Sequence, residues 1–258
     1  MGVANTGRVV AVVNADDFGI SPQVSADIAT CFDAGRITST TILANLPGFE
    51  DACALAKRHG FADRVGVHVN LTFGPALSEA MRRYREATGL AGVPPKRLFA
   101  APSVLEAVEG EIRAQLARVV AQGIQPTHID SHEHILNGFG YATTALRVAR
   151  EFGVVRIRLA RNAYYARTPL KWLFKTSYNR YLRLAGARTV RYFADVKPYF
   201  RHVHGGGAHL RGPIELMCHP GARLREPIAG AARETELLLG PEFGAFLRGL
   251  QLIPYIEV

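Results

Sequence analysis

Two adjacent carboxylates follow an apolar run early in the sequence. The run Val9 to Val13 leads into Asn14, and Asp16 and Asp17 come next, just before Gly19. A short apolar run that ends in polar residues and a glycine is typical of a buried strand with a tight exit. When two carboxylates are in contact, their repulsion raises the pKa of one of them. A divalent cation bound to one carboxylate would remove this repulsion and leave the other free as a base. The alternative is a solvated loop or a helix N-cap.

Histidines occur in three later segments that have the composition of strands. His68 interrupts the apolar stretch 65–72, and His219 lies at the turn that ends 215–221. In segment 127–135 alternate residues are polar, and in an extended chain these share one face: His128, Asp130, His132 and His134. A lone strand histidine is usually a satisfied core residue. Three histidines and an aspartate on one face would each need a buried partner, which favours metal binding or acid–base chemistry.

Length and composition indicate a globular protein. The chain has 258 residues, an ordinary length for a single α/β barrel domain. Although 48% of its residues are hydrophobic, no apolar run approaches the ~20 residues of a membrane-spanning helix. The run 9–13 is too short for a signal peptide. The three cysteines (Cys31, Cys53 and Cys218) are odd in number and lack C-x-x-C spacing, so disulfides and a zinc–thiolate site are not expected. Such cysteine usage predicts a cytoplasmic location.

Strand-like and helix-like segments alternate along the sequence, which indicates parallel strands joined by right-handed crossovers. Strands are predicted at 9–15, 39–44, 65–71, 127–131, 154–158, 214–218 and 251–258, and helices at 22–34, 49–58, 106–122, 143–152 and 230–239. Several of the strands end in polar residues, and parallel barrels place their chemistry at that end. Segment 73–103, rich in Pro, Gly and Arg, is predicted to be a long loop over this face.

Five motifs, in order along the chain, resemble those of the YdjC-like carbohydrate deacetylases, a family that includes chitooligosaccharide and hopanoid-associated deacetylases. They are Asn14-Ala-Asp-Asp-Phe-Gly19, Thr38-Ser-Thr-Thr41, Gly66-Val-His68, Asp130-Ser-His-Glu-His134 and Met217-Cys-His-Pro220. The resemblance implies an α/β fold, a deformed (β/α) barrel of about seven parallel strands that forms a single domain over 1–258. Residues 160–211 do not look like the usual family sequence, and we interpret them as a basic, aromatic insertion.

Matched residue by residue, the resemblance implies one divalent metal ion on Asp17, His68 and His132. It also implies hydrolysis of an N-acetyl group from an amino sugar, with Asp16 as general base and His219 as general acid. An amide is a poor electrophile with a poor leaving group, so its hydrolysis needs an activated water, a stabilised oxyanion and a proton donor. Nitrogen and oxygen ligands without thiolate fit Zn²⁺, and Mg²⁺ or Mn²⁺ is the alternative.

Three more polar residues are expected behind the ligands and the proton donor. Asn14, Asp130 and His134 would orient a ligand histidine or tune the acid. For Asp130 and His134 the alternative is ordinary hydrogen bonding at the end of a strand.

Positive charge is concentrated in one part of the chain. The formal net charge is +9, and segment 152–194 contains ten Lys or Arg and no Asp or Glu. Thr168 and Pro169 predict the start of a helix. On its helical wheel one side is apolar (Leu170, Leu173, Phe174, Tyr181 and Leu184), and the other is basic and includes Trp172 (Lys171, Lys175, Arg180 and Arg183).

Two interpretations of this helix lead to different substrates. A helix that packs on the barrel with a solvated basic face leaves a free oligosaccharide as the substrate. A basic, aromatic surface over 160–194 could instead rest on anionic lipid. The chain would then be peripheral at the inner face of the membrane and act on a lipid-linked N-acetyl sugar.

Other functions compete with sugar deacetylation. Another metal-dependent amidase or a deformylase would use the same scaffold. The net charge of +9 also suggests nucleic-acid binding as an alternative function. No zinc finger, RNP motif or helix-turn-helix accompanies the charge, so no nucleic-acid partner is expected. An inactive binding module disagrees with the presence of base, ligands and acid together. The sequence makes no prediction about oligomeric state.

Overall fold

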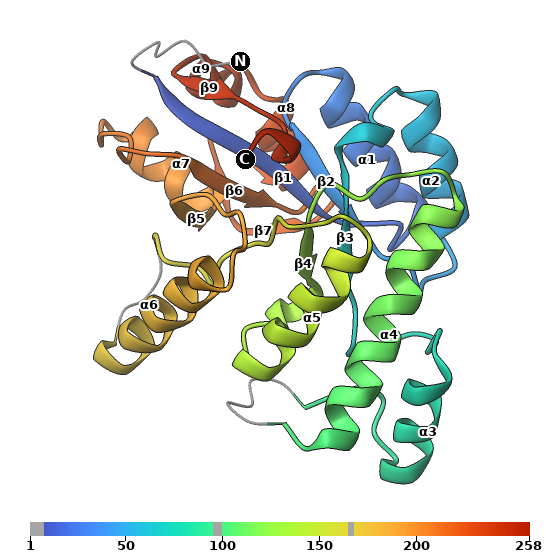
Figure 1. Cartoon of the computed structure of the whole chain (residues 1–258). Helices are drawn as coiled ribbons and strands as arrows, with labels where there is room; N and C mark the ends of the chain where they lie inside the picture. The colour runs from blue at the N-terminus through green and yellow to red at the C-terminus, as the bar shows by residue number, and fades with distance from the viewer. Residues whose placement is uncertain (1–7, 95–99, 165–167) are drawn as a thin grey trace.

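Parallel strands curl into a half-barrel at the centre of the molecule (Figure 1). They are β1 (Val9–Phe18), β2 (Ser39–Ile42), β3 (Val65–Val69), β4 (Ile129–Ser131), β5 (Tyr192–Asp195), β6 (Ile214–Cys218) and β9 (Leu250–Leu252). Their order is β4-β3-β2-β1-β6-β5, and β9 pairs with β1. The computed structural model describes residues 8–94, 100–164 and 168–258. It confirms the deformed (β/α) barrel of about seven strands in a single α/β domain.

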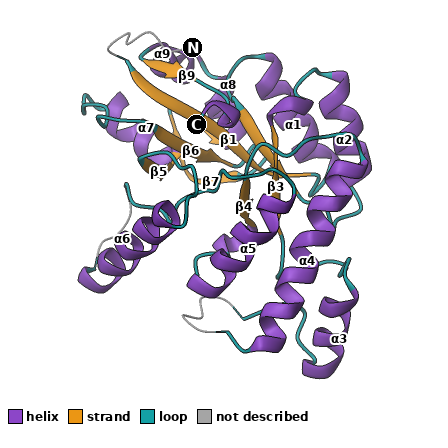
Figure 2. Cartoon of the chain, in the orientation of Figure 1, coloured by secondary structure: helices purple, strands orange, loops and turns teal. Residues whose placement is uncertain are grey.

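Helices cover the outside of the curled sheet (Figure 2). They are α1 (Pro22–Asp33), α2 (Phe49–Arg58), α3 (Glu79–Thr88), α4 (Pro102–Ala121), α5 (Phe139–Glu151), α6 (Pro169–Leu184), α7 (Val196–His204), α8 (Glu234–Leu239) and α9 (Pro241–Arg248). In the described part of the chain, none of them has the length and apolar character to cross a bilayer. The three cysteines are buried and unpaired.

The two edges of the half-barrel are connected by an irregular segment rather than by a regular strand. The stretch 154–158, predicted as a strand, makes only single bridges, from Ile157 to β4 and from Arg156 to Arg188. Further along, the N–H groups of Asn162 and Ala163 donate to the Phe193 carbonyl of β5 at 3.3 and 3.2 Å. This segment therefore spans the gap between β4 and β5, and it is what makes the barrel deformed.

The predicted loop at 73–103 is wrong, because much of it is helical. Ser78 caps α3 by accepting the N–H of Met81 at 3.1 Å. The buried Glu111 of α4 accepts the N–H of Ser78 at 2.9 Å and that of Leu77 at 3.1 Å. This long-range carboxylate cap holds α3 against α4, and such a contact is invisible in a local pattern. Residues 95–99 of the predicted loop lie outside the described residues.

Other predicted boundaries also differ from the structure. Residues 231–233 form β8 (Ala231–Arg233), which pairs antiparallel with β7 (Arg223–Ile228), so the predicted helix 230–239 begins only at Glu234. The last strand ends at Leu252 and is followed by a 3-10 turn, Tyr255–Glu257. Four elements, β5, α7, β7 and α9, were not predicted at all.

The predicted one-face array at 127–135 is also wrong. The strand β4 ends at Ser131, and His132–His134 form a 3-10 turn in which Glu133 and His134 have left-handed φ values of 52° and 54°. His128 faces the core, where its ring stacks on Tyr255 with 3.8 Å between centroids. Opposite it, a Cβ on Gly66 would lie 2.5 Å from the His128 ring, so only glycine fits there.

The helix predicted from Thr168 is confirmed, but of the apolar side of its wheel only Phe174 and Tyr181 pack inward, against Phe139. Thr168 caps α6 by accepting the N–H of Lys171 at 3.3 Å. Its buried side chains are Tyr178, Asn179 and Leu182. The leucines on the apolar side of the wheel are exposed instead.

Candidate metal centre and active site

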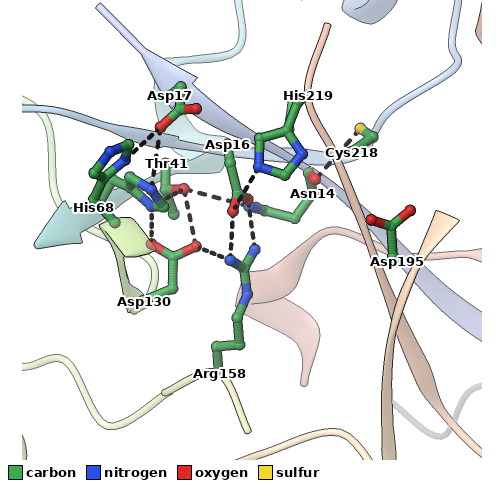
Figure 3. Close-up of polar contacts among 12 residues, drawn as sticks. Asn14, Asp16, Asp17, Thr41, His68, Asp130, Arg158, Asp195, Cys218 and His219 are labelled. Carbon is green, nitrogen blue, oxygen red and sulfur yellow. Dashed lines mark hydrogen bonds and ion pairs between the residues drawn. The ribbon is translucent and has the colours of Figure 1, made fainter. Parts of the chain in front are cut away.

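A bulge at the end of β1 brings both adjacent carboxylates to one site. Neighbouring side chains of a strand normally point to opposite faces. Here the pairing of β1 with β2 shifts register between Ala15 and Phe18, and Asp17 has a left-handed φ of 68°. Aspartate tolerates this conformation better than most residues, and bulges commonly redirect side chains beside active sites. As a result Asp16 and Asp17 both lie close to His68 (Figure 3).

Asp17, His68 and His132 converge as the resemblance implied. Oδ1 of Asp17 lies 2.9 Å from Nδ1 of His132 and 3.3 Å from Nε2 of His68. One ligand atom from each residue falls within 4.8 Å of the others. Ligand atoms that each lie ~2.1 Å from one ion are about 3 Å apart, so this spacing fits a single divalent ion. The ion would also explain why a carboxylate and two histidines share one small volume.

His68 is oriented from behind by Asp130. The Nδ1 of His68 lies 2.7 Å from Oδ1 of Asp130, and the Thr41 hydroxyl donates to Oδ2 of Asp130 at 3.0 Å. A histidine that gives its Nδ1 proton to a carboxylate presents the lone pair of Nε2 to a metal. Burial alone would lower the pKa of His68, but Asp130 and Asp17 outweigh it and raise the pKa to about 10. The surrounding negative charge thus keeps His68 protonated, and a bound metal ion would take the place of that proton.

Asp16 is held in its ionised form by a buried arginine. The Arg158 guanidinium grips both oxygens of Asp16, at 2.6 and 2.7 Å, and the Asn14 amide donates to Asp16 at 3.0 Å. Burial alone would raise the pKa of Asp16, but the ion pair with Arg158 outweighs it and keeps the pKa well below its usual range. Asp16 therefore stays a fixed, ionised carboxylate next to the proposed ligands.

Arg158 and Glu215 are site residues that the sequence interpretation missed. Besides Asp16, Arg158 contacts Asp130 at 2.7 Å and Glu215 at 2.6 Å. Glu215 also accepts the Tyr255 hydroxyl at 3.0 Å, and burial raises its pKa to about 7. The signal for Arg158 was its place at the end of the predicted strand 154–158, the same strand-then-polar pattern that drew attention to Asp16.

A second carboxylate and histidine set, Asp16 with His68 and Asp130, is also close enough to hold an ion. Its two carboxylates are already engaged by the Arg158 guanidinium at 2.6 to 2.7 Å. A cation there would face the arginine charge directly. The Asp17 set has no such cation in contact among the described residues, so it is the better metal site.

His219 lies on the other side of Asp16 from the ligands. Its Nε2 is 3.9 Å from Oδ2 of Asp16, and a third of its side chain is exposed. The turn is fixed because its backbone N–H donates to Glu234 at 2.9 Å, and Lys197 pairs with the same carboxylate at 2.7 Å. Lys197 also lines an adjoining groove of about 450 Å³ with Arg201, Arg223 and Arg225.

His134 is not brought to the ligands. Its ring packs edge-on against Phe193, with 6.0 Å between centroids, and burial lowers its pKa to about 3. It lines a small hollow with Asp130, Arg158 and Tyr178. Of the four polar residues predicted to share one face, Asp130 and His132 reach the proposed metal centre, whereas His128 and His134 do not.

We expect Asp130→Asn to lower the affinity for a divalent ion about 10- to 100-fold, the range for groups behind a ligand histidine. The amide keeps the size of the side chain but loses the charge that fixes the Nδ1 proton of His68. Titration calorimetry with Zn²⁺ would measure the change. Asp195→Asn is the matched control, because Asp195 ends β5 and pairs with Lys197 at 3.3 Å. Equal affinities in the two variants would show that Asp130 does not support the site.

Known proteins are similar to this chain over nearly its whole length. The family model described as YdjC-like protein matches residues 10–249. A carbohydrate deacetylase of Brevibacillus brevis is 36% identical, over 96% of this chain and 98% of the relative. A carbohydrate deacetylase of Geobacillus stearothermophilus is 32% identical, over 95% and 96% of the two chains.

Solved structures share the fold. A candidate cellobiose-phosphate cleavage protein from Enterococcus faecalis superposes with a TM-score of 0.70 at 24% identity, over 97% of this chain and 98% of that one. A lactam utilization protein from Thermus thermophilus has a TM-score of 0.55 at 16% identity, over 95% and 100%. With a family model that spans nearly the whole chain and relatives above 30% identity at full length, this chain belongs to the YdjC-like family.

Proposed function

We propose that this chain is a divalent-metal-dependent hydrolase that removes the N-acetyl group of an amino sugar. The observation that supports it most strongly is the convergence of Asp17, His68 and His132 within 4.8 Å of one another, beside the arginine-held carboxylate of Asp16. The names of the Brevibacillus and Geobacillus relatives support a carbohydrate substrate and a deacetylation reaction.

The cofactor in this proposal is one divalent ion on Asp17, His68 and His132. Such an ion would polarise the acetyl carbonyl and lower the pKa of water. One carboxylate oxygen and two imidazole nitrogens are ligands that Zn²⁺ accepts, and Mg²⁺ or Mn²⁺ would use the carboxylate with additional waters.

Two side chains move the protons in the proposed reaction. Asp16 accepts a proton from the attacking water, and Arg158 and Asn14 keep its carboxylate aimed at that water. As the C–N bond breaks, His219 donates a proton to the departing amine. The products are acetate and the free amino sugar. Because Nε2 of His219 lies 3.9 Å from Oδ2 of Asp16, one bound amide can contact both.

The sugar is either a free oligosaccharide or a lipid-linked sugar. Both offer the same N-acetyl group to the site. A deformylase or another amidase would use the same site for a different acyl group. The identity of the released acid separates these activities, because deacetylation gives acetate and deformylation gives formate.

We expect Asp16→Asn to abolish turnover while the metal stays bound, because Asp16 is a base rather than a ligand in this proposal. His219→Ala should lower kcat more than it changes KM, since proton donation matters only in the transition state. The loss of kcat in His219→Ala should be about 10²- to 10⁴-fold, the usual value of a positioned acid or base. Steady-state kinetics and metal analysis on the same samples provide the measurement. A kcat like that of the wild type in either variant would rule out the assigned role.

A panel of N-acetyl sugars tests the proposal as a whole. We expect mass spectrometry to detect acetate from at least one free or lipid-linked N-acetyl sugar, and its release should stop with a chelator and return with added divalent ion. Formate release from formylated substrates alone, or acetate release that the chelator does not change, would contradict the proposed reaction.

A further inference from the structure

Four large apolar side chains of α6 are exposed, and we call the exposed surface of this helix its outer face. Leu170 is 78% exposed, Leu184 77%, Leu173 56% and Trp172 50%. Among the described residues these are the highest exposed fractions of any large apolar side chain. Single exposed leucines are ordinary, but a group of them on one element of a folded domain marks an interaction surface.

The helix could have buried these leucines and does not. Its inner face is fixed by other groups: Asn179 exchanges two hydrogen bonds with the backbone of Ala160, at 2.8 and 2.9 Å. The Tyr178 hydroxyl donates to the Leu136 carbonyl at 2.7 Å, and Phe174 packs edge-on against Phe139 of α5. Figure 1 shows α6 at the periphery of the molecule, beside α5. The apolar face is therefore held outward by specific contacts on the opposite side.

All charges on α6 have the same sign. Lys171, Arg180 and Arg183 are exposed, and among the described residues no carboxylate forms an ion pair with them. Segment 152–194 as a whole contains no Asp or Glu. Leucine and tryptophan beside lysine and arginine on one helix are what an interfacial helix uses, with apolar groups among the acyl chains and cations at anionic headgroups.

We propose that the outer face of α6 docks on an anionic lipid membrane. From Leu170 to Leu184 the helix is ~21 Å long at 1.5 Å per residue, so it can lie flat in the interface and place apolar side chains at both ends. A second copy of the chain is a poor occupant, because each copy would present the same basic helix and the two would repel. A bilayer offers the opposite charge together with an apolar layer.

Docking would place the membrane beside the wall of the active site. Tyr178 of α6 lines the same small hollow as Asp130 and Arg158. Ala160, which Asn179 holds, is two residues from Arg158. The contact therefore favours a lipid-linked sugar over a free one. This preference rests on the proposed function, whereas the docking of α6 on a membrane does not.

The only tryptophan of the chain reports on the contact directly. The sequence contains one Trp, Trp172. We expect its fluorescence to shift to shorter wavelength with vesicles of phosphatidylcholine and phosphatidylglycerol, and to be quenched by brominated lipid. Pure phosphatidylcholine vesicles should bind far less, and added salt should release the protein. The full chain should co-sediment with the anionic vesicles under the same conditions.

Matched variants test which side chains are responsible. Leu170→Ser combined with Leu173→Ser should abolish the shift and the co-sedimentation, whereas Leu90→Ser should change neither. Leu90 is also an exposed leucine, 45% exposed, and it follows α3. Each of Lys171→Gln and Arg180→Gln should weaken binding about fivefold, the value of one cation at an anionic surface. Because α6 is anchored through its other face, these variants should keep the unfolding midpoint of the wild type.

Several results would overturn the proposal. One is no binding to anionic vesicles, and another is binding in which Trp172 shows neither shift nor quenching. A blue shift that grows with protein concentration without vesicles would assign the face to a second copy. Asp16→Asn should bind vesicles like the wild type, so loss of activity and loss of docking remain distinguishable.

Discussion

The buried guanidinium of Arg158 is the interaction on which the rest of the site depends. It contacts three carboxylates, those of Asp16, Asp130 and Glu215, at 2.6 to 2.7 Å. Buried charges need partners, and removing one partner of such a set leaves the others uncompensated. One arginine cannot balance three carboxylates, and Asp17 adds a fourth nearby. This excess of negative charge explains the raised pKa of His68, and it adds to the burial that raises the pKa of Glu215. A divalent cation would relieve it.

The position of Arg158 also links the site to the shape of the barrel. It belongs to the segment that bridges β4 and β5 without forming a regular strand. A regular strand would continue the ladder, whereas this irregular backbone leaves Arg158 inside the half-barrel and passes on to Ala160, where α6 is attached. Barrel closure, base orientation and the placement of α6 therefore depend on one stretch of chain.

Much of the site could be predicted from the sequence, because its residues follow apolar strands. Asp16, Asp17 and His68 end or interrupt such runs, and parallel strands bring their carboxyl ends together. The alternation of polar residues in 127–135 led to the wrong prediction of a single strand face. The strand β4 stops at Ser131, and residues with left-handed φ values then turn the chain, a change that polar spacing alone does not reveal. The predicted motif order nevertheless placed His132 correctly beside Asp17.

What could not be predicted depends on contacts between distant segments. The role of Arg158 requires knowing that Asp16, Asp130 and Glu215 meet around it. The inward face of α6 is chosen by Asn179 and Tyr178, whose backbone partners lie 19 and 42 residues away. On the helical wheel the leucines share one apolar side with Phe174 and Tyr181, so the wheel alone does not show that the leucines are exposed.

Anomalous diffraction from crystals grown with Zn²⁺ tests the central claim most directly. Our account predicts one strong peak within ~2.0–2.2 Å of an Asp17 oxygen and of one nitrogen from each of His68 and His132, with Arg158 still paired to Asp16. A peak between Asp16 and Asp130 that displaces Arg158, or no peak at these residues, would contradict it.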